Sequence, residues 1–153
     1  MAKSEKDKAW DEYAKFIKIR DCLEASGLPF IGKCITHGVA QYHIRYLQAG
    51  HFVSGRSDAV LFNNKFVNTQ CNFCNMINHG ETDKYRNVLY KRHGKAFVDR
   101  WELKLKAYAK SAKVDMTDED WINRRKRYKR KAGILLRRYG YKTWKELLDD
   151  GCC

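Results

Sequence analysis

The chain has 153 residues, 44% of them hydrophobic, and a formal net charge of +13, so it has room for about one domain with a buried core, which excludes wholesale disorder. No segment approaches the roughly 18 consecutive apolar residues of a membrane span, and the charged amino end lacks the apolar stretch of a secretory signal, so we expect a cytoplasmic protein. A charge excess of this size on a small chain indicates a polyanionic partner, and nucleic acid is the foremost candidate.

The first predicted element is an amphipathic helix that begins after Ser4. Apolar side chains recur at spacings of three and four from Trp10 onward, as one buried helix face requires, and Ser4 is a favourable N-cap residue. Gly27 and Pro29 end the helix. Residues 1–28 are therefore expected to form an amino-terminal helical unit.

The next segment has the character of short β-structure. From residue 30 to residue 66 the chain is rich in β-branched and aromatic residues and turn glycines, without a helical period. Strands are predicted over residues 39–47 and 59–62. A helix is expected to begin just after Cys71 and to end near Gly80.

The remainder of the chain is predicted to be helical. Thr143 and Glu146 have the spacing of a capping box, and glycines mark two of the helix ends. The expected helices span residues 82–94, 95–113 and 117–140, followed by a short one after Thr143. We expect residues 29–94 to form a core and residues 95–153 a basic helical region.

The charge is concentrated in this helical region. Residues 34–80 carry three Lys or Arg side chains and one acid, whereas Trp121 to Lys145 holds eleven Lys or Arg side chains and no acid. Such a run contacts phosphates in many nucleic-acid-binding proteins. The simpler interpretation is that these cations form a solvated helix face. The predicted DNA-binding residues are Arg124, Arg125, Arg127, Arg130, Lys131, Arg137 and Arg138.

Two pairs of candidate metal ligands flank the weakly charged segment. Cys34 and His37 form one pair and Cys71 and Cys74 the other, each with two residues between its members. Thiolate and imidazole ligands in this pattern are typical of structural zinc, which would supply folding energy to a segment too small to bury enough surface. His43 is an alternative fourth ligand. The competing interpretation is a chance spacing of buried thiols, and a redox role lacks the βαβ context it requires.

Between and after these pairs lie residues suited to phosphodiester hydrolysis. His51 follows a glycine and can accept a proton near neutral pH, and Arg56 can clamp a phosphate oxygen. Asn75 and His79 are four residues apart on the expected helix, so both would reach one divalent cation. Residues 34–80 lack paired carboxylates, which argues against a two-metal acidic cluster. A histidine after a glycine is also compatible with a purely structural role.

Three segments resemble a known family. Leu47–Phe52 (LQAGHF), Ala59–Phe62 (AVLF) and Val67–Asn75 (VNTQCNFCN) look like the phage NinG (Rap) recombination nucleases of the HNH, or ββα-metal, superfamily, over about residues 8–105. The resemblance implies an α+β fold in which a treble-clef-like zinc knuckle carries a ββα-metal HNH core between amino-terminal and carboxy-terminal helices. It also implies an endonuclease of branched recombination DNA, in the host cytoplasm if the chain is phage-encoded, with recombination proteins as further partners.

The resemblance also implies roles for particular residues. His51 matches the family's general base and Asn75 its metal-holding asparagine, with Mg²⁺ or Mn²⁺ as the catalytic cation. Cys34, Cys71 and Cys74 match the cysteines that hold structural Zn²⁺.

Three positions depart from the family pattern. His37 replaces a zinc cysteine and can still bind zinc. Phe66 stands at the central asparagine of the HNH motif, so Asn64 or Asn68 must brace the catalytic loop, or the brace is missing. Gly50 stands where many HNH enzymes have an aspartate ligand, a glycine that NinG-like proteins share, which leaves His79 or Glu81 to complete the metal's ligands.

We therefore expect a metal-dependent DNA endonuclease with His51 as the general base. The alternative is a catalytically inactive, zinc-stabilised DNA-binding protein in recombination, which Phe66 favours. A third hypothesis is a zinc-bearing module that binds a recombinase or a single-strand-binding protein. Junction cleavage needs two incisions, which a homodimer would serve, although no heptad pattern requires one.

Overall fold

A computed structural model describes residues 2–55, 57–111 and 116–150. It begins with helix α1 (Glu5–Ser26). The Ser4 hydroxyl accepts a hydrogen bond from the backbone N–H of Asp7, and Gly27 takes the left-handed conformation (φ 77°) that ends the helix. The predicted first helix is thus confirmed, together with the residues that start and stop it.

Two short antiparallel hairpins follow α1. Strand β1 (Ile31–Lys33) pairs with β2 (Gln41–His43), and β3 (Leu47–His51) pairs with β4 (Val67–Cys71). In the second hairpin Leu47 lies opposite Cys71 and His51 lies opposite Val67. The mixture of helices with two small sheets confirms the α+β class.

Both predicted strands differ from the structure. Residues 39–47 do not form one strand, because a 3₁₀ turn η1 (Ile44–Tyr46) separates β2 from β3 and is capped when His43 Nδ1 accepts a hydrogen bond from Arg45 N. The strand expected over residues 59–62 is wrong. Helix α2 (Asp58–Leu61) occupies that segment, and its single turn buries Val60 and Leu61 together.

The second half of the described chain is helical, as expected. Thr117 and Thr143 each form a capping box with an acidic residue three positions later. The elements are the π-helical turn η2 (Phe73–Ile77), α3 (Thr82–His93), α4 (Lys95–Lys110), α5 (Asp118–Arg138) and α6 (Trp144–Asp149).

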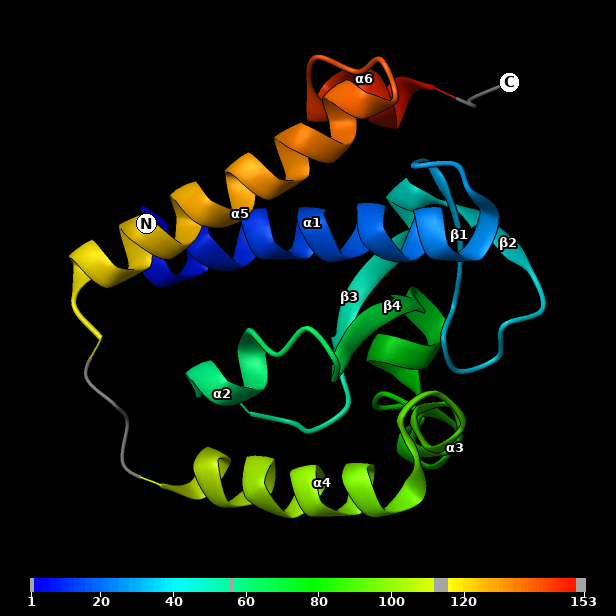
Figure 1. Cartoon of the computed structure of the whole chain (residues 1–153), viewed down its shortest axis with the longest axis vertical. Coiled ribbons are helices and arrows are strands. Elements are labelled where there is room, and N and C mark those ends of the chain that lie inside the picture. Colours follow the sequence, from blue (N-terminus) through cyan, green and yellow to red (C-terminus); the bar gives the residue numbers. More distant parts are fainter. Residues whose placement is uncertain (1, 56, 112–115, 151–153) are drawn as a thin grey trace.

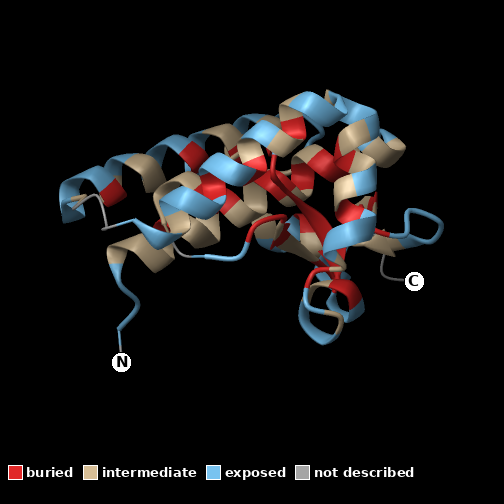
Figure 2. Ribbon diagram, turned by 90° about the horizontal axis from the view of Figure 1, so that it is seen from below, coloured by how far each residue is buried: buried red, intermediate tan, exposed pale blue. Residues whose placement is uncertain are grey.

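The β3–β4 hairpin lies between two helical layers. Helices α1 and α5 run side by side on one side of it, and α3 and α4 cover the other (Figure 1). The buried residues lie on the facing sides of these elements (Figure 2). Tyr13 and Ile17 of α1 pack with Val67 of β4 and Tyr128 of α5 in one cluster. The hairpin is therefore held by helices from both ends of the chain, across the predicted boundaries between units.

A second cluster joins the hairpin to the opposite layer. Phe52 and Phe66, which follow β3 and precede β4 at the end where the connecting segment joins them, pack against Tyr85 of α3 and against α4. Phe66 is 2% exposed and its ring also stacks near Phe97 and Trp101. Residue 66, which the resemblance aligns with a motif asparagine, is therefore part of an apolar core.

A buried ion pair anchors α1 to β4. Asp21 accepts hydrogen bonds from the backbone N–H of Thr69 (2.7 Å) and from Arg20 Nε (2.6 Å), while Arg20 Nη2 donates to the Val67 carbonyl (2.9 Å). Burial raises the pKa of Asp21, an effect that the Arg20 guanidinium opposes. All five residues of β4 are buried, three of them polar, so the strand lacks the alternating pattern by which strands are recognised in a sequence.

No helix in the described ranges is both long enough and apolar enough to cross a membrane.

The ion pair between α3 and α4 yields a stability prediction. Glu102 is 8% exposed and accepts hydrogen bonds from Arg86 Nε (3.0 Å) and Nη2 (2.8 Å), and these bonds lower the pKa of Glu102. We expect Glu102→Gln to reduce the free energy of unfolding by about 2 kcal/mol, measured by urea denaturation at pH 7.

A depressed pKa means that this contribution is full above the unfolded-state pKa of Glu102 and is lost as the pH falls through the lower, folded-state value. The difference between wild type and Glu102→Gln should therefore shrink in acid. Asp83→Asn is the matched control, because Asp83 binds the same Arg86 but its side chain is 94% exposed. An equal loss in both variants would contradict the prediction.

Candidate metal centre and the adjoining strand end

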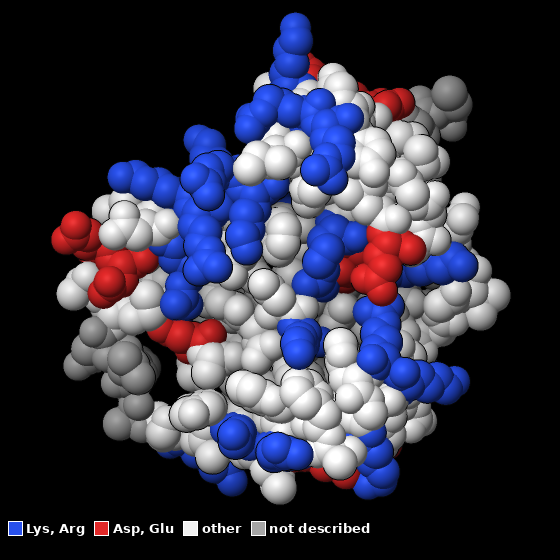
Figure 3. Space-filling model, in the orientation of Figure 1, with Lys and Arg blue, Asp and Glu red and all other residues white. Residues whose placement is uncertain are grey.

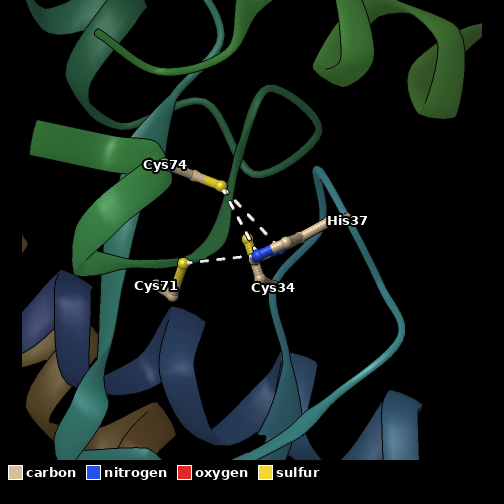
Figure 4. A group of neighbouring side chains, drawn as sticks. All are labelled: Cys34, His37, Cys71 and Cys74. Atoms are coloured by element: carbon tan, nitrogen blue, oxygen red, sulfur yellow. Dashed lines mark hydrogen bonds between the residues drawn. The ribbon is translucent and has the colours of Figure 1, made fainter. Parts of the chain in front are cut away.

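Four candidate ligands converge from three separate elements. Cys34 follows β1, His37 lies in the loop between β1 and β2, Cys71 is the last residue of β4, and Cys74 lies in η2. Their ligand atoms all lie within 4.8 Å of one another (Figure 4). The predicted pairing of the two motifs into one cluster is confirmed.

The spacing of these atoms fits a tetrahedral zinc ion. His37 Nε2 lies 4.0 Å from Cys71 Sγ and 4.0 Å from Cys74 Sγ. Zinc bonds to sulfur and nitrogen place neighbouring ligand atoms about 3.5–4 Å apart. The alternative ligand, His43, is engaged elsewhere, because its Nε2 lies 2.7 Å from the backbone carbonyl oxygen of Asp150. His37 is therefore the fourth member of the cluster.

The loop around Cys34 is arranged to favour a thiolate. Burial opposes ionisation, but hydrogen bonds from the Thr36 hydroxyl and from the backbone N–H groups of Cys71, Thr36 and His37 lower the pKa of Cys34 overall. Burial raises the pKa of Cys74 to about 12. A cation that binds here must therefore displace a proton from Cys74, which couples metal affinity to pH.

His51, the candidate general base, is at the far end of β3, the strand whose first residue lies beside this cluster. His51 is the last residue of β3, and the Trp10 indole of α1 stacks on its ring with centroids 4.7 Å apart and planes 22° apart. Because side chains alternate along a strand, His51 faces α1, whereas Gly50 and Gln48 face η2 and α3.

Gly50 is a glycine because two side chains occupy the space of its Cβ. A Cβ there would collide with Oε1 of Gln70 and would lie 2.9 Å from Oδ1 of Asn75. Gln70 is fully buried and donates through Nε2 to the Gly80 carbonyl (2.8 Å), while its Oε1 accepts no hydrogen bond from the described part of the chain. Asn75 donates through Nδ2 to Gln48 Oε1 (2.7 Å), which leaves Oδ1 on the Gly50 side.

Gln70 is thus a candidate site residue that the sequence analysis missed. It occupies the space next to the strand where an aspartate at position 50 would project. The signal in the sequence that could have indicated Gln70 was Gly50. A glycine at that position leaves room beside β3 for an oxygen donor from the paired strand.

Asn68 is connected to the backbone before His51 through Tyr85. Its Nδ2 donates to the Tyr85 hydroxyl (3.0 Å), and that hydroxyl donates to the Gly50 carbonyl (3.1 Å). Both side chains are buried. Of the residues named as possible braces, Asn68 is thus linked to the Gly50 backbone through Tyr85, whereas the Asn64 backbone carbonyl accepts from Arg20.

His79 does not lie on a helix with Asn75, so that expectation is wrong. Helix η2 ends at Ile77 and has the wide π-helical turn, which removes the four-residue repeat. His79, Gly80 and Glu81 follow with positive φ angles of 50°, 88° and 49°. Left-handed backbone at non-glycine residues is strained and is concentrated at functional sites.

The predicted phosphate clamp, Arg56, lies outside the described residues. The remaining site residues form two groups at the end of β3: His51 with Trp10 on the α1 side, and Asn75 with Gln70 on the η2 side.

Some cations of the basic helix α5 contact rings or a carboxylate of the fold, and others are exposed to solvent. Lys and Arg side chains gather along α5 on the face seen in Figure 3. Arg124 lies over the Phe62 ring (4.8 Å), Arg125 pairs with Glu5 (2.9 Å), and Lys131 lies over Phe16 (5.3 Å). The exposed members of the predicted set are Arg127, Arg130, Arg137 and Arg138.

The cluster predicts zinc-dependent folding. Elemental analysis of the purified protein should give about one zinc per chain, and Cys71→Ser should lose the metal and unfold residues 30–80, because the loop after β1 is tied to β4 through this ion. Thermal melting with and without a chelator measures the effect.

Cys22→Ser is the matched control, since Cys22 is also a fully buried free cysteine but lies in α1 outside the cluster. It should retain zinc. Absence of zinc from the wild type, with an unchanged melting curve for Cys71→Ser, would refute the site.

Comparison with known families gave one match. A family model described as bacteriophage lambda NinG protein matches residues 3–138, a span that contains the Cys/His cluster, His51 and all of α5. No curated protein and no solved structure gave a match.

Proposed function

Because the chain belongs to the bacteriophage lambda NinG family, we propose that it is a metal-dependent endonuclease that hydrolyses phosphodiester bonds in branched recombination DNA. The observation that carries the proposal is the end of β3. There, β3 ends in the His51 imidazole, and amide oxygens of Gln70 from β4 and Asn75 from η2 lie around residue 50, with the Cys/His cluster at the other end of the hairpin.

The proposal treats β3, β4 and η2 as a ββα-metal core of the HNH type. Their order, two antiparallel strands followed by a helical turn, supports this interpretation. The Cys/His cluster, with Zn²⁺, would be the knuckle that fixes η2 against the hairpin.

The residues around Gly50 fit a hard divalent cation, Mg²⁺ or Mn²⁺. Gln70 Oε1 is a buried oxygen that accepts no hydrogen bond within the described ranges, and Asn75 Oδ1 borders the same point. Oxygen donors suit these cations, which complete their coordination with water and substrate phosphates. When bound, such a cation would stabilise charge on the phosphate and on the leaving oxygen. His79 would be a further donor.

The protein's own residues would prepare the reaction. His51 would accept the proton of the attacking water, and the stacked Trp10 indole restricts the orientation of the imidazole. The buried Asn68–Tyr85 relay holds the Gly50 carbonyl, which fixes the backbone immediately before His51. Arg56 would hold a phosphate oxygen.

Helix α5 would hold the flanking DNA. Its exposed arginines at positions 127, 130, 137 and 138 can contact phosphates without reading bases, which predicts strong salt dependence and recognition of DNA shape. Arg124, Arg125 and Lys131 would contribute less, because each already contacts a ring or a carboxylate. A homodimer would deliver the two incisions of a junction, and recombination proteins are the proposed partners.

A catalytically inactive DNA-binding protein is the second candidate. The burial of Phe66 among aromatic rings favours it, because the HNH asparagine is absent from that place. The Asn68–Tyr85 relay favours the enzyme, because it restores a brace to the same loop.

The deciding experiment is cleavage of a four-way DNA junction with Mn²⁺. We expect wild type to nick the junction and His51→Ala to lower the nicking rate by about 10²–10⁴-fold, as loss of a general base does. His93→Ala, on α3 away from the strand end, is the control and should nick normally.

Equal nicking by wild type and His51→Ala would show that His51 is not the general base. Junction binding without nicking by the wild type would select the inactive DNA-binding protein.

The oxygen donors are tested by metal binding without DNA. We expect Gln70→Leu to weaken Mn²⁺ binding about tenfold, measured by electron paramagnetic resonance of free Mn²⁺, and Gln70→Glu to retain binding because it keeps an oxygen at that position. Both variants lose the hydrogen bond to Gly80, so the loss of that bond cannot explain a difference between them. Equal binding in both would exclude Gln70 as a ligand.

A further inference from the structure

A cavity of about 590 Å³ opens between α2, α4 and α5, and neither the zinc cluster nor the strand end uses it. Its lining includes four aromatic residues and two arginines of α5. They are Phe62, Trp101, Tyr108 and Tyr128, with Arg124 and Arg127. This volume accommodates a flat ring system of nucleobase size.

The flat groups of the cavity already stack on one another. The Arg124 guanidinium lies 4.8 Å from the Phe62 ring centroid and 5.3 Å from that of Trp121, and Arg127 lies 5.9 Å from that of Tyr128. Tyr108 is 49% exposed at the carboxyl end of α4, so its ring is accessible to a ligand. Aromatic and guanidinium planes of this kind bind bases by stacking.

The polar lining favours a base over a phosphate. Asp58 lines the cavity beside the amides of Asn63 and Asn64, and its carboxylate lies 3.7 Å from Lys6. A carboxylate repels a phosphate but accepts hydrogen bonds from the amino groups of bases, and amides can both donate and accept. The arginines are placed to neutralise the sugar–phosphate backbone of the same nucleotide.

The cavity is close to the candidate base. The Trp10 ring that stacks on His51 also meets the Phe62 ring edge-on, with centroids 6.1 Å apart. One aromatic residue therefore separates His51 from the cavity wall. A nucleotide bound in the cavity and a phosphate at His51 would therefore lie close together on the same DNA strand.

We propose that this cavity binds one unpaired nucleobase of the DNA strand that passes over His51, an inference that rests on the proposed function. Bases in a continuous duplex are stacked and paired, so entry would require their extrusion. A base at a branch point or in a single strand enters without that penalty. The cavity would thus give a basic, shape-reading protein its selectivity for branched DNA.

The test is binding without added Mg²⁺ or Mn²⁺ and with zinc retained. A single-stranded oligonucleotide that carries 2-aminopurine, and a blunt duplex of the same sequence, are titrated with protein. We expect stacking in the cavity to quench the 2-aminopurine fluorescence. Tyr108→Ala should weaken single-strand binding about tenfold and leave duplex binding unchanged.

Two variants serve as controls. Tyr139→Ala removes an exposed tyrosine outside the cavity and should change neither affinity. Arg130→Gln removes an exposed charge of α5 outside the cavity and should weaken single-strand and duplex binding to the same degree. Melting temperatures close to wild type establish that the variants are folded.

An equal effect of Tyr108→Ala on both DNAs, or unchanged 2-aminopurine fluorescence on binding, would overturn the proposal. Because no cleavage is measured, a protein that binds the unpaired base but never nicks would retain the cavity assignment and lose the endonuclease.

Discussion

The convergence of Cys34, His37, Cys71 and Cys74 on one point is the constraint on which the candidate site depends. Cys71 ends β4 and lies opposite Leu47, the first residue of β3, so the cluster is continuous with the hairpin ladder. Cys74 lies in η2, one residue before Asn75. An ion held here would therefore fix the loop after β1, the hairpin and η2 relative to one another.

At the end of β3, two positions that depart from the pattern of the proposed HNH-type core, Gly50 and Phe66, are each packed against side chains from other elements. With glycine at position 50, the Gln70 side chain from the paired strand fills the vacated space and carries a buried oxygen. With phenylalanine at position 66, the core gains an aromatic stack, and Asn68 reaches the Gly50 backbone through Tyr85. In the proposed enzyme, Gln70 and Asn68 would supply the polar groups that the motif residues supply elsewhere.

The basic half of the chain serves two purposes. Helix α5 packs against α1 through Tyr128, and several of its cations contact rings or carboxylates within the fold. The exposed arginines remain for a polyanion. This division explains why nine Lys and Arg side chains are compatible with one stable helix: part of the charge is compensated locally, and the rest faces solvent, where like charges repel weakly.

The sequence by itself determined the helices and the metal cluster. Ser4, Thr117 and Thr143 cap helices through contacts with residues three positions away, and the spacing of each Cys/His pair fits a turn, so local information was sufficient. The sequence did not reveal β4, because burial of its polar residues depends on Asp21, Tyr85 and Gly80, which are distant in the chain. It also mistook α2 for a strand, since a run of four apolar residues does not distinguish the two.

The tertiary structure alone decided which side chains surround His51. Trp10 reaches it from α1 and Gln70 reaches Gly50 across the hairpin, contacts that join residues far apart in sequence. The cavity between α2, α4 and α5 has the same origin, because its rings and arginines come from three segments with no common motif. Residue spacing records which groups are adjacent along a helix or turn, whereas packing between elements determines which groups meet in space.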